Sequence, residues 1–170
     1  VGLSPAVSTP FTVTHAAANK LAVSVQPVNS KVNVVISPAV VVLVQDAYSN
    51  TVMDSTVSIT ASLKEGGVAA AGKIKTGSTT SVSASSGTAT FDAIALNAAA
   101  TDLKFTMSGS GVTSVDTALF ITATGPVNSM VITTQPTTAA VSGPDNLGDV
   151  ILTFKDSNDA TAAFSGTVTA

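Results

Sequence analysis

Apolar and polar side chains alternate along much of the chain, and this pattern predicts β-strands. Residues 57–63 read Val-Ser-Ile-Thr-Ala-Ser-Leu, so every second side chain is apolar. Because successive side chains of a strand point to opposite faces, this period places one face in a core and the other in solvent. Such alternation, or a short apolar run between turn residues, predicts strands at residues 21–26, 40–44, 57–63, 74–82, 89–93, 103–107 and 118–122. Short strands at this spacing are typical of a sandwich of two sheets.

Two segments of small residues interrupt the strands. Residues 66–72 and 98–100 are rich in glycine and alanine, and we expect loops or a short helical turn there. The segment 74–82 is polar for a strand. We expect it at the edge of a sheet, where the charges of Lys73 and Lys75 would discourage pairing with another chain.

The chain also matches itself at an offset of about 110 residues. Four blocks align: Phe11 with Phe120, Gln26-Pro27 with Gln135-Pro136, Asp46 with Asp156, and Thr56-Val57 with Thr167-Val168. The offset grows from 109 to 111 residues along the chain, as short loop insertions would produce. A repeat of this length is close to the roughly 100 residues of an immunoglobulin-like sandwich.

The repeat predicts three parts. Residues 1–16 would be the last strand of a preceding domain, and residues 17–124 would form one complete domain. Residues 125–170 would be the first strands of a following domain that this chain cuts short. The linkers between these parts are only a few residues long, so we expect the orientation of neighbouring domains to be restricted.

Four motifs support a family resemblance. They are Leu-x-Val-x-x-Gln-Pro from Leu21, Asp-x-x-x-Asn from Asp46 to Asn50, Ser-Thr-Val-Ser-Ile from Ser55, and Ser-Gly-Thr-Ala-Thr-Phe from Ser86 to Phe91. Together they resemble bacterial Ig-like repeats, which occur in large adhesins, surface-layer proteins and other cell-envelope proteins. The family usually has glycine before the asparagine of the second motif, where this chain has Ser49. The resemblance implies an all-β chain of tandem immunoglobulin-like β-sandwich repeats.

Composition narrows the location and the partners. Charged residues make up 10% of the chain, there is no arginine, and the net charge is −3. Binding to nucleic-acid phosphates needs clustered basic side chains, so we exclude nucleic-acid partners. The absence of cysteine excludes disulfides and thiolate metal sites, and it favours a bacterial or archaeal envelope over a eukaryotic extracellular protein. The longest apolar run, residues 39–44, is far shorter than the roughly 20 residues of a membrane-spanning helix.

Candidate catalytic chemistry is sparse. The only histidine is His15, which we expect to be an exposed residue between domains rather than a general base. The acidic residues stand singly at turns, where aspartate side chains commonly bind nearby backbone N–H groups. The sequence therefore predicts neither an enzyme nor an organic cofactor.

A Ca²⁺ site is the one metal hypothesis, because Ca²⁺ takes oxygen ligands from Asp, Asn and backbone carbonyls of loops. The candidate ligands are Asp46, Asn50 and Asp54 in one turn, Asp156, Asn158 and Asp159 in its copy, and the nearby pair Asp145 and Asp149. The alternative is ordinary turn chemistry, in which the same carboxylates bind the backbone.

The function that we expect is structural. The chain would be a spacer or assembly unit of an extracellular or cell-surface protein, such as a surface layer, sheath or stalk. Its partners would be the neighbouring repeats and identical chains in a lattice or filament. An alternative is an adhesin repeat that binds a glycan or host protein through its loops, although the loops offer Tyr48 and no arginine. An enzyme elsewhere in a longer protein, with this chain as an accessory region, is a third possibility.

Overall fold

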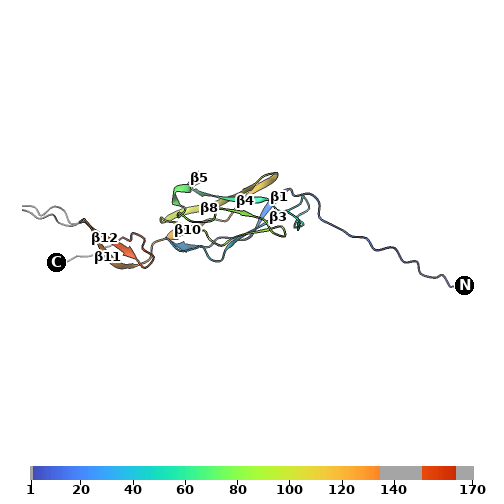
Figure 1. Ribbon diagram of the computed structural model, residues 1–170, viewed down its shortest axis with the longest axis horizontal. Helices are drawn as coiled ribbons and strands as arrows, with labels where there is room; N and C mark the ends of the chain where they lie inside the picture. Colours follow the sequence, from blue (N-terminus) through green and yellow to red (C-terminus); the bar gives the residue numbers. More distant parts are fainter. Residues whose placement is uncertain (1, 135–150, 164–170) are drawn as a thin grey trace, which may run out of the picture.

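The regular secondary structure is almost entirely β-strand (Figure 1). The computed structural model describes residues 2–134 and 151–163. The strands are β1 Lys20–Val25, β2 Ser30–Lys31, β3 Val40–Gln45, β4 Ser58–Glu65, β5 Val68–Ala69, β6 Ser81–Ser83, β7 Thr88–Phe91, β8 Ala100–Gly109, β9 Val112–Asp116, β10 Phe120–Ala123, β11 Val127–Thr134 and β12 Ile151–Asp156. Within these residues there is one 3₁₀ turn, η1, which spans Ala71–Lys73. The all-β prediction is confirmed.

Strands β1 to β10 form the main body, which spans residues 20–123 and has two layers. One layer contains β1, β3 and β7, which pair antiparallel. The other contains β4 and β8 with β10, β2, β5 and β6. Strand β9 joins the layers because it pairs with β8 antiparallel and with β1 parallel. The sheet is mixed, since β2 and β10 are also parallel. Strands β11 and β12 form a separate antiparallel pair.

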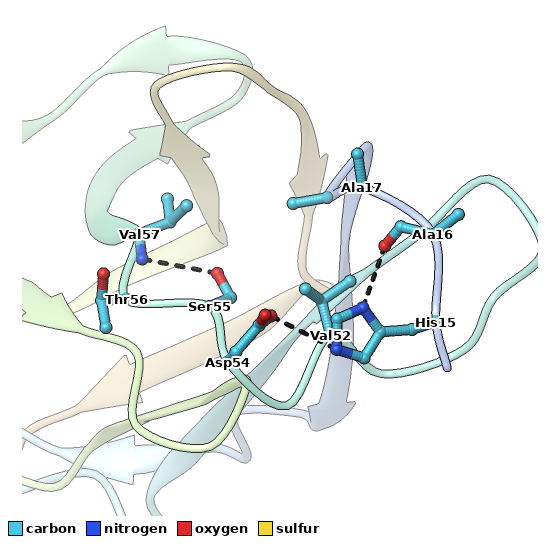
Figure 2. Close-up of a pocket in the computed structure, with 9 residues that line it drawn as sticks. His15, Ala16, Ala17, Val52, Asp54, Ser55, Thr56 and Val57 are labelled. Atoms are coloured by element: carbon cyan, nitrogen blue, oxygen red, sulfur yellow. Dashed lines mark hydrogen bonds and ion pairs between the residues drawn. The ribbon is translucent and has the colours of Figure 1, made fainter. Parts of the chain in front are cut away.

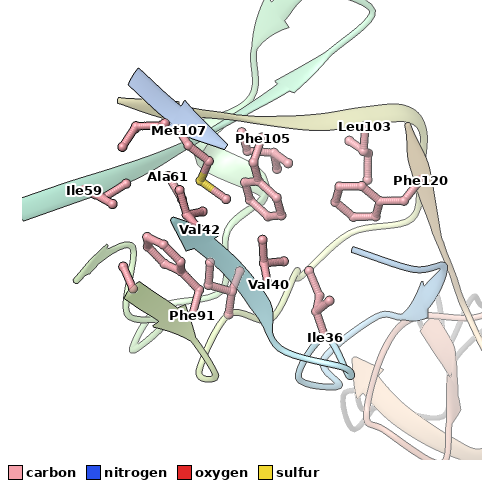
Figure 3. Close-up of a cluster of buried hydrophobic side chains, with 14 of the residues drawn as sticks. Ile36, Val40, Val42, Ile59, Ala61, Phe91, Leu103, Phe105, Met107 and Phe120 are labelled. Carbon is pink, nitrogen blue, oxygen red and sulfur yellow. The ribbon is translucent and has the colours of Figure 1, made fainter. Parts of the chain in front are cut away.

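The core lies between the two layers. Side chains of β3 and β7, including Val40, Val42 and Phe91, point toward Ile59 of β4 and Phe105 of β8 (Figure 3). In β4 every second residue is buried from position 59 to 63, as the alternation predicts. Burial of a Val, Leu, Ile, Phe or Met side chain contributes about 1.5–3 kcal/mol, so many buried Val and Leu residues can stabilise a core that holds few aromatic rings.

An aromatic pair closes the core near the end where the main body continues into β11. The rings of Phe105 and Phe120 stack with their centroids 5.4 Å apart. From Leu119 to Thr122 the side chains alternate, since Phe120 and Thr122 are buried whereas Leu119 and Ile121 face solvent. The strand is shorter than the predicted 118–122, because it begins at Phe120, and Ala118 is exposed.

The prediction of one edge strand over residues 74–82 is wrong. Only Ser81–Ser83 is a strand, and Ile74 forms an isolated bridge with Leu96. A turn at Gly77, with φ of +89°, separates the two pieces. The hydroxyl of Ser78 accepts the Ala95 N–H and donates to the Ala95 carbonyl, which binds this segment to a loop.

Strands β2, β5 and β9 of the main body were not predicted. Strand β9 is half-exposed and largely polar, so it has no clear period of two, and β2 has only two residues. Of the segments expected as loops or short helical turns, residues 66–72 contain β5 and the start of η1. Residues 98–99 form a loop and Ala100 begins β8.

Candidate functional site

A tight turn follows β3 at residues 46–50, and we call it the Asp46 turn. The Asp46 N–H donates to the Asn50 carbonyl oxygen at 2.9 Å, and the Ser49 N–H donates to the Asp46 carbonyl oxygen at 3.1 Å. Ser49 has φ of 72°, the left-handed conformation that such a turn requires. These bonds direct the Asp46 side chain into the protein, where it is fully buried.

The Asp46 carboxylate accepts four N–H groups, one of them from the segment before β1. Its Oδ1 atom accepts the backbone N–H groups of Tyr48 and Asn50, both at 2.9 Å. Its Oδ2 atom accepts the Asn50 side-chain amide at 3.0 Å and the Ala16 backbone N–H at 2.9 Å. Ala16 lies 30 residues earlier in the chain. The carboxylate therefore fastens the incoming linker to the turn.

These donors stabilise the ionised carboxylate. The Asn50 side-chain amide is the strongest influence, and the backbone N–H groups of Ala16, Asn50 and Tyr48 add to it. Together they outweigh the opposing effect of burial and lower the pKa of Asp46 from 3.8 to about 2. At neutral pH these bonds therefore form a charge-assisted hydrogen-bond network. We call this arrangement, in which a buried turn carboxylate binds its own turn and the preceding linker, the carboxylate clasp.

A second turn, at residues 156–160, repeats this arrangement, and we call it the Asp156 turn. Oδ1 of Asp156 accepts the N–H groups of Asn158 at 2.8 Å and Ala160 at 3.0 Å. Oδ2 accepts the Gly125 N–H at 2.6 Å. These bonds lower the pKa of Asp156, and the bond from Gly125 has the largest effect. The positive charge of Lys31 lowers it further by a small amount. Asp159 has φ of 63°, matching Ser49.

The strands that lead into the two turns also pair in the same register. Leu21 lies opposite Val44 in the first pair, and Met130 lies opposite Phe154 in the second. Met130 follows Leu21 by 109 residues, and Phe154 follows Val44 by 110 residues. These are the offsets at which the chain matches itself. In each case the carboxylate at the end of the second strand binds the backbone just before the first strand.

A second feature joins the first and last parts of the main body. Residues 26–32 run beside residues 118–123, and we call this contact the terminal seam. The Gln26 side-chain oxygen accepts the Ala118 N–H at 2.8 Å, and the Asn29 side-chain oxygen accepts the Ile121 N–H at 3.0 Å. The parallel pairing of β2 with β10 continues the contact. The seam thus ties the start of the main body to its last strand.

His15 lies in a surface cavity of about 570 Å³ between the linker and residues 52–57 (Figure 2). Its Nε2 atom is 3.3 Å from Oδ1 of Asp54, and its Nδ1 atom is 3.0 Å from the Ala16 carbonyl oxygen. Both ring nitrogens therefore face oxygen acceptors, and neither is directed at a hydroxyl. The nearby Ser55 hydroxyl accepts the Val57 N–H instead. This geometry is not a Ser-His-Asp relay. His15 is also less exposed than we expected.

The structure separates most of the proposed Ca²⁺ ligands. Asp46 and Asn50 meet, but the amide nitrogen of Asn50 faces the carboxylate. Asp54 pairs with His15 instead, and Asp159 binds the Lys155 amine at 2.7 Å.

In the Asp156 turn the candidate oxygens likewise have protein partners. Asp156 accepts N–H groups, and the carbonyl oxygen of Asn158 accepts the side-chain amide of Asn33. Asp145 and Asp149 lie outside the described residues. Within residues 2–134 and 151–163, no three His, Cys, Asp or Glu side chains are placed to share a metal ion.

Several residues of the site have little or no signal in the sequence. Gln26 stands out only as part of a motif, and Asn29 belongs to no motif. Ala16 and Gly125 contribute only a backbone N–H, so no side-chain pattern marks them, although the repeat offset of 109 residues does pair them.

Gly87, from the Ser-Gly-Thr motif, lies against the backbone that follows the Asp46 turn. It has φ of +71°, and a Cβ atom there would lie 2.6 Å from the Val52 carbonyl oxygen. The backbone at Val52 can approach this closely only because position 87 has no side chain.

Comparison with known proteins leaves the family open. No protein-family model matches the chain, and a search of curated proteins found no significant match. Across the part of the chain that the structure describes, no helix has the length and apolar character needed to cross a membrane. The geometry of the two turns and the terminal seam is therefore the basis on which function is inferred.

Proposed function

We propose that this chain is a structural segment of consecutive immunoglobulin-like β-sandwich units. Residues 1–16 would end one unit, residues 17–124 would form a complete unit, and residues 125–170 would begin the next. The segment would act as a spacer that transmits load, and it would have no catalytic role. The observation that carries this proposal is the carboxylate clasp, which occurs twice with the same backbone partners, 110 residues apart.

The two clasps support modular organisation because each one fastens a linker to the unit that follows it. A single continuous domain would have no reason to build the same turn twice in the same register. Phe11, which lies before the main body, supports the same proposal. It is the copy of the buried Phe120 and yet is 83% exposed. In a preceding unit its ring would have a core to enter.

The path of the chain supports a role in bearing load. The segment before β1 leaves one end of the main body, and β11 and β12 lie at the other end (Figure 1). A pull on these two ends would draw residues 26–32 and 118–123 in opposite directions along the terminal seam. Because the two segments are parallel, the hydrogen bonds of the seam would be loaded together in shear rather than broken one at a time.

The proposed location is the surface of a bacterial or archaeal cell, and it rests on the resemblance to bacterial Ig-like repeats. Neighbouring units of the same chain would be the first partners. Assembly of identical chains into a lattice or filament is also part of the proposal. A mean hydropathy of +0.47 and the exposed side chains of Val35, Leu119 and Ile121 support it.

Single-molecule pulling on the two ends of the chain tests the mechanical role. The double variant Gln26→Ala/Asn29→Ala removes two side-chain acceptors from the seam. We expect it to unfold at clearly lower force than the unmodified chain. Ser78→Ala is the matched control, because it removes two hydrogen bonds of the same body away from the seam. Equal loss of force in both variants would contradict a load-bearing seam. Saturable binding of the chain on a glycan array would instead support the adhesin alternative.

A further inference from the structure

The two turns differ in what covers them. The Asp156 turn packs against the loops at the exit end of the main body, residues 32–33 and 97–99, which we call the loop end. The Asn33 side-chain amide donates to the Asn158 carbonyl oxygen at 3.1 Å. Ala160 is only 5% exposed. The corresponding residues of the Asp46 turn, Tyr48 and Asn50, are exposed, Tyr48 to 80%.

The cavities beside the two turns correspond position by position. A cavity of about 260 Å³ beside the Asp156 turn is lined by Thr124, Ala160 and Thr161 on one side and by the loop end on the other. Beside the Asp46 turn lies a larger cavity of about 490 Å³. Its lining includes the copies of those three residues, which are His15, Asn50 and Thr51.

The larger cavity has no counterpart of the loop end. Its remaining lining residues, Val13, Thr14 and Met53, come from the linker and from the chain that follows the turn. It is therefore the same groove with one wall absent. Met53, which lines the cavity, is an exposed apolar side chain, and Tyr48 of the Asp46 turn is exposed as well.

We propose that the groove beside the Asp46 turn, formed by His15, Asn50, Thr51 and Met53, is a docking surface for the loop end of a preceding unit of the same kind. This inference rests on the proposed tandem organisation. The contact between the loop end and the Asp156 turn, which we call the visible joint, shows the expected pairing: Asn33 donates to the Asn158 carbonyl oxygen, and residues 97–99 lie across the cavity from Ala160. The preceding unit would in the same way present an asparagine amide to the Tyr48 carbonyl oxygen and small side chains to Asn50.

Charge complementarity at the visible joint fits the same partner. Lys31, next to the loop end, lowers the pKa of Asp156 across the joint. A lysine at the equivalent place of a preceding unit would act on Asp46 in the same way. Docking would then fix the angle between successive units, and a short linker alone would only limit it.

A chain in which residues 17–125 are duplicated in tandem tests this surface. Thr124 and Gly125 of the first copy then occupy the places of His15 and Ala16 before the second copy, so the new groove has threonine at the place of His15, as the cavity beside the Asp156 turn does. The unmodified chain has one tyrosine and no tryptophan, so Tyr48→Phe in the first copy leaves a single fluorescent residue at the new joint. We expect acrylamide quenching of this tyrosine to be roughly twofold weaker than in the unmodified chain, because packing against a partner shields side chains from solvent.

Two further variants of the first copy sharpen the test. Asn33→Gly removes the amide while keeping a residue that tolerates φ of 64°, and it should restore quenching. Ser86→Gly, at another left-handed position with φ of 49°, should leave the protection unchanged.

The two possible failures are distinguishable. If calorimetry shows that both copies fold but the tyrosine is quenched as in the unmodified chain, docking is wrong and the tandem organisation stands. If the added copy does not fold, the tandem organisation fails and the docking surface fails with it.

Discussion

The Asp46 turn and the Asp156 turn share one hydrogen-bond arrangement but differ in their exposure to solvent. Both bury a carboxylate that binds two N–H groups of its own turn and one from the preceding linker. The Asp46 turn adds a fourth donor, the Asn50 side chain, where the second turn has Ala160. The open turn thus uses an additional hydrogen bond, whereas the covered turn uses a small side chain that lets another surface approach. The turn is therefore constant, and position 50 or 160 adapts it to its surroundings.

Removing the first carboxylate should have the largest effect. Asp46→Ala leaves the part-buried N–H groups of Ala16, Tyr48 and Asn50 without their shared acceptor. We expect the Tm of the main body to fall by about 15 °C, because several hydrogen bonds to one charged group are lost together and the Tm of a small domain responds steeply to such a loss. Differential scanning calorimetry measures this change. Asp92→Ala, at an exposed aspartate, is the control for loss of charge. A Tm within the error of that control would contradict the claim that the Asp46 carboxylate stabilises the main body.

Acid should weaken the same clasp without any mutation. The pKa of Asp46 is lowered from 3.8 to about 2, so the folded protein holds the ionised form more tightly than the unfolded chain does. The resulting stability is fully present above about pH 4 and is lost as the pH falls toward 2. In thermal unfolding across this range, the difference in Tm between the unmodified chain and Asp46→Asn should shrink steadily.

Some acid sensitivity should remain in the Asp46→Asn variant. The pKa of Asp116 is also lowered, chiefly by its bond to Lys104, and that of Asp156 by Gly125. A Tm difference that stays constant between pH 4 and pH 2 would show that the Asp46 charge contributes nothing to the fold.

The sequence predicts those parts of this arrangement that depend on side-chain pattern. The alternation in residues 57–63 predicts β4 and its buried face, and the aspartate at two positions 110 residues apart marks both turns. The donors that Asp46 and Asp156 bind are mostly backbone N–H groups, and these leave no trace in a sequence. A turn aspartate suits either Ca²⁺ or the backbone. In both described turns the carboxylate oxygens accept N–H groups, because the left-handed residues Ser49 and Asp159 fold those groups inward.

Exchanging the side chain that distinguishes the two turns should have an intermediate effect. Asn50→Ala gives the first turn the residue of the second and removes the bond that most lowers the pKa of Asp46. We expect the Tm to fall by about 5 °C, the order for one hydrogen bond to a charged group at a solvent-exposed position. Asn19→Ala, at an exposed asparagine nearby, is the matched control. If the two variants melt together, packing rather than the amide holds the first turn.

The smallest effect is expected at the linker residue of the second turn, where Gly125 replaces the Ala16 of the first. A Cβ atom at position 125 would lie 3.1 Å from Oδ2 of Asp156, closer than most such contacts, and the N–H to oxygen distance there is 2.6 Å. At Ala16, which carries a Cβ atom, the same distance is 2.9 Å. In Gly125→Ala the carboxylate should therefore shift by a few tenths of an ångström and the bond should lengthen toward that of the first turn.

Amide hydrogen exchange at residue 125 should rise by only about threefold, since the joint remains formed and only its local opening is easier. The melting of the main body should not change. A rise of about 100-fold or more would mean that the second joint opens when its linker carries a methyl group. The two clasps would then have the same bonds but different tolerances, and the glycine would be a requirement of the joint rather than an accident of the repeat.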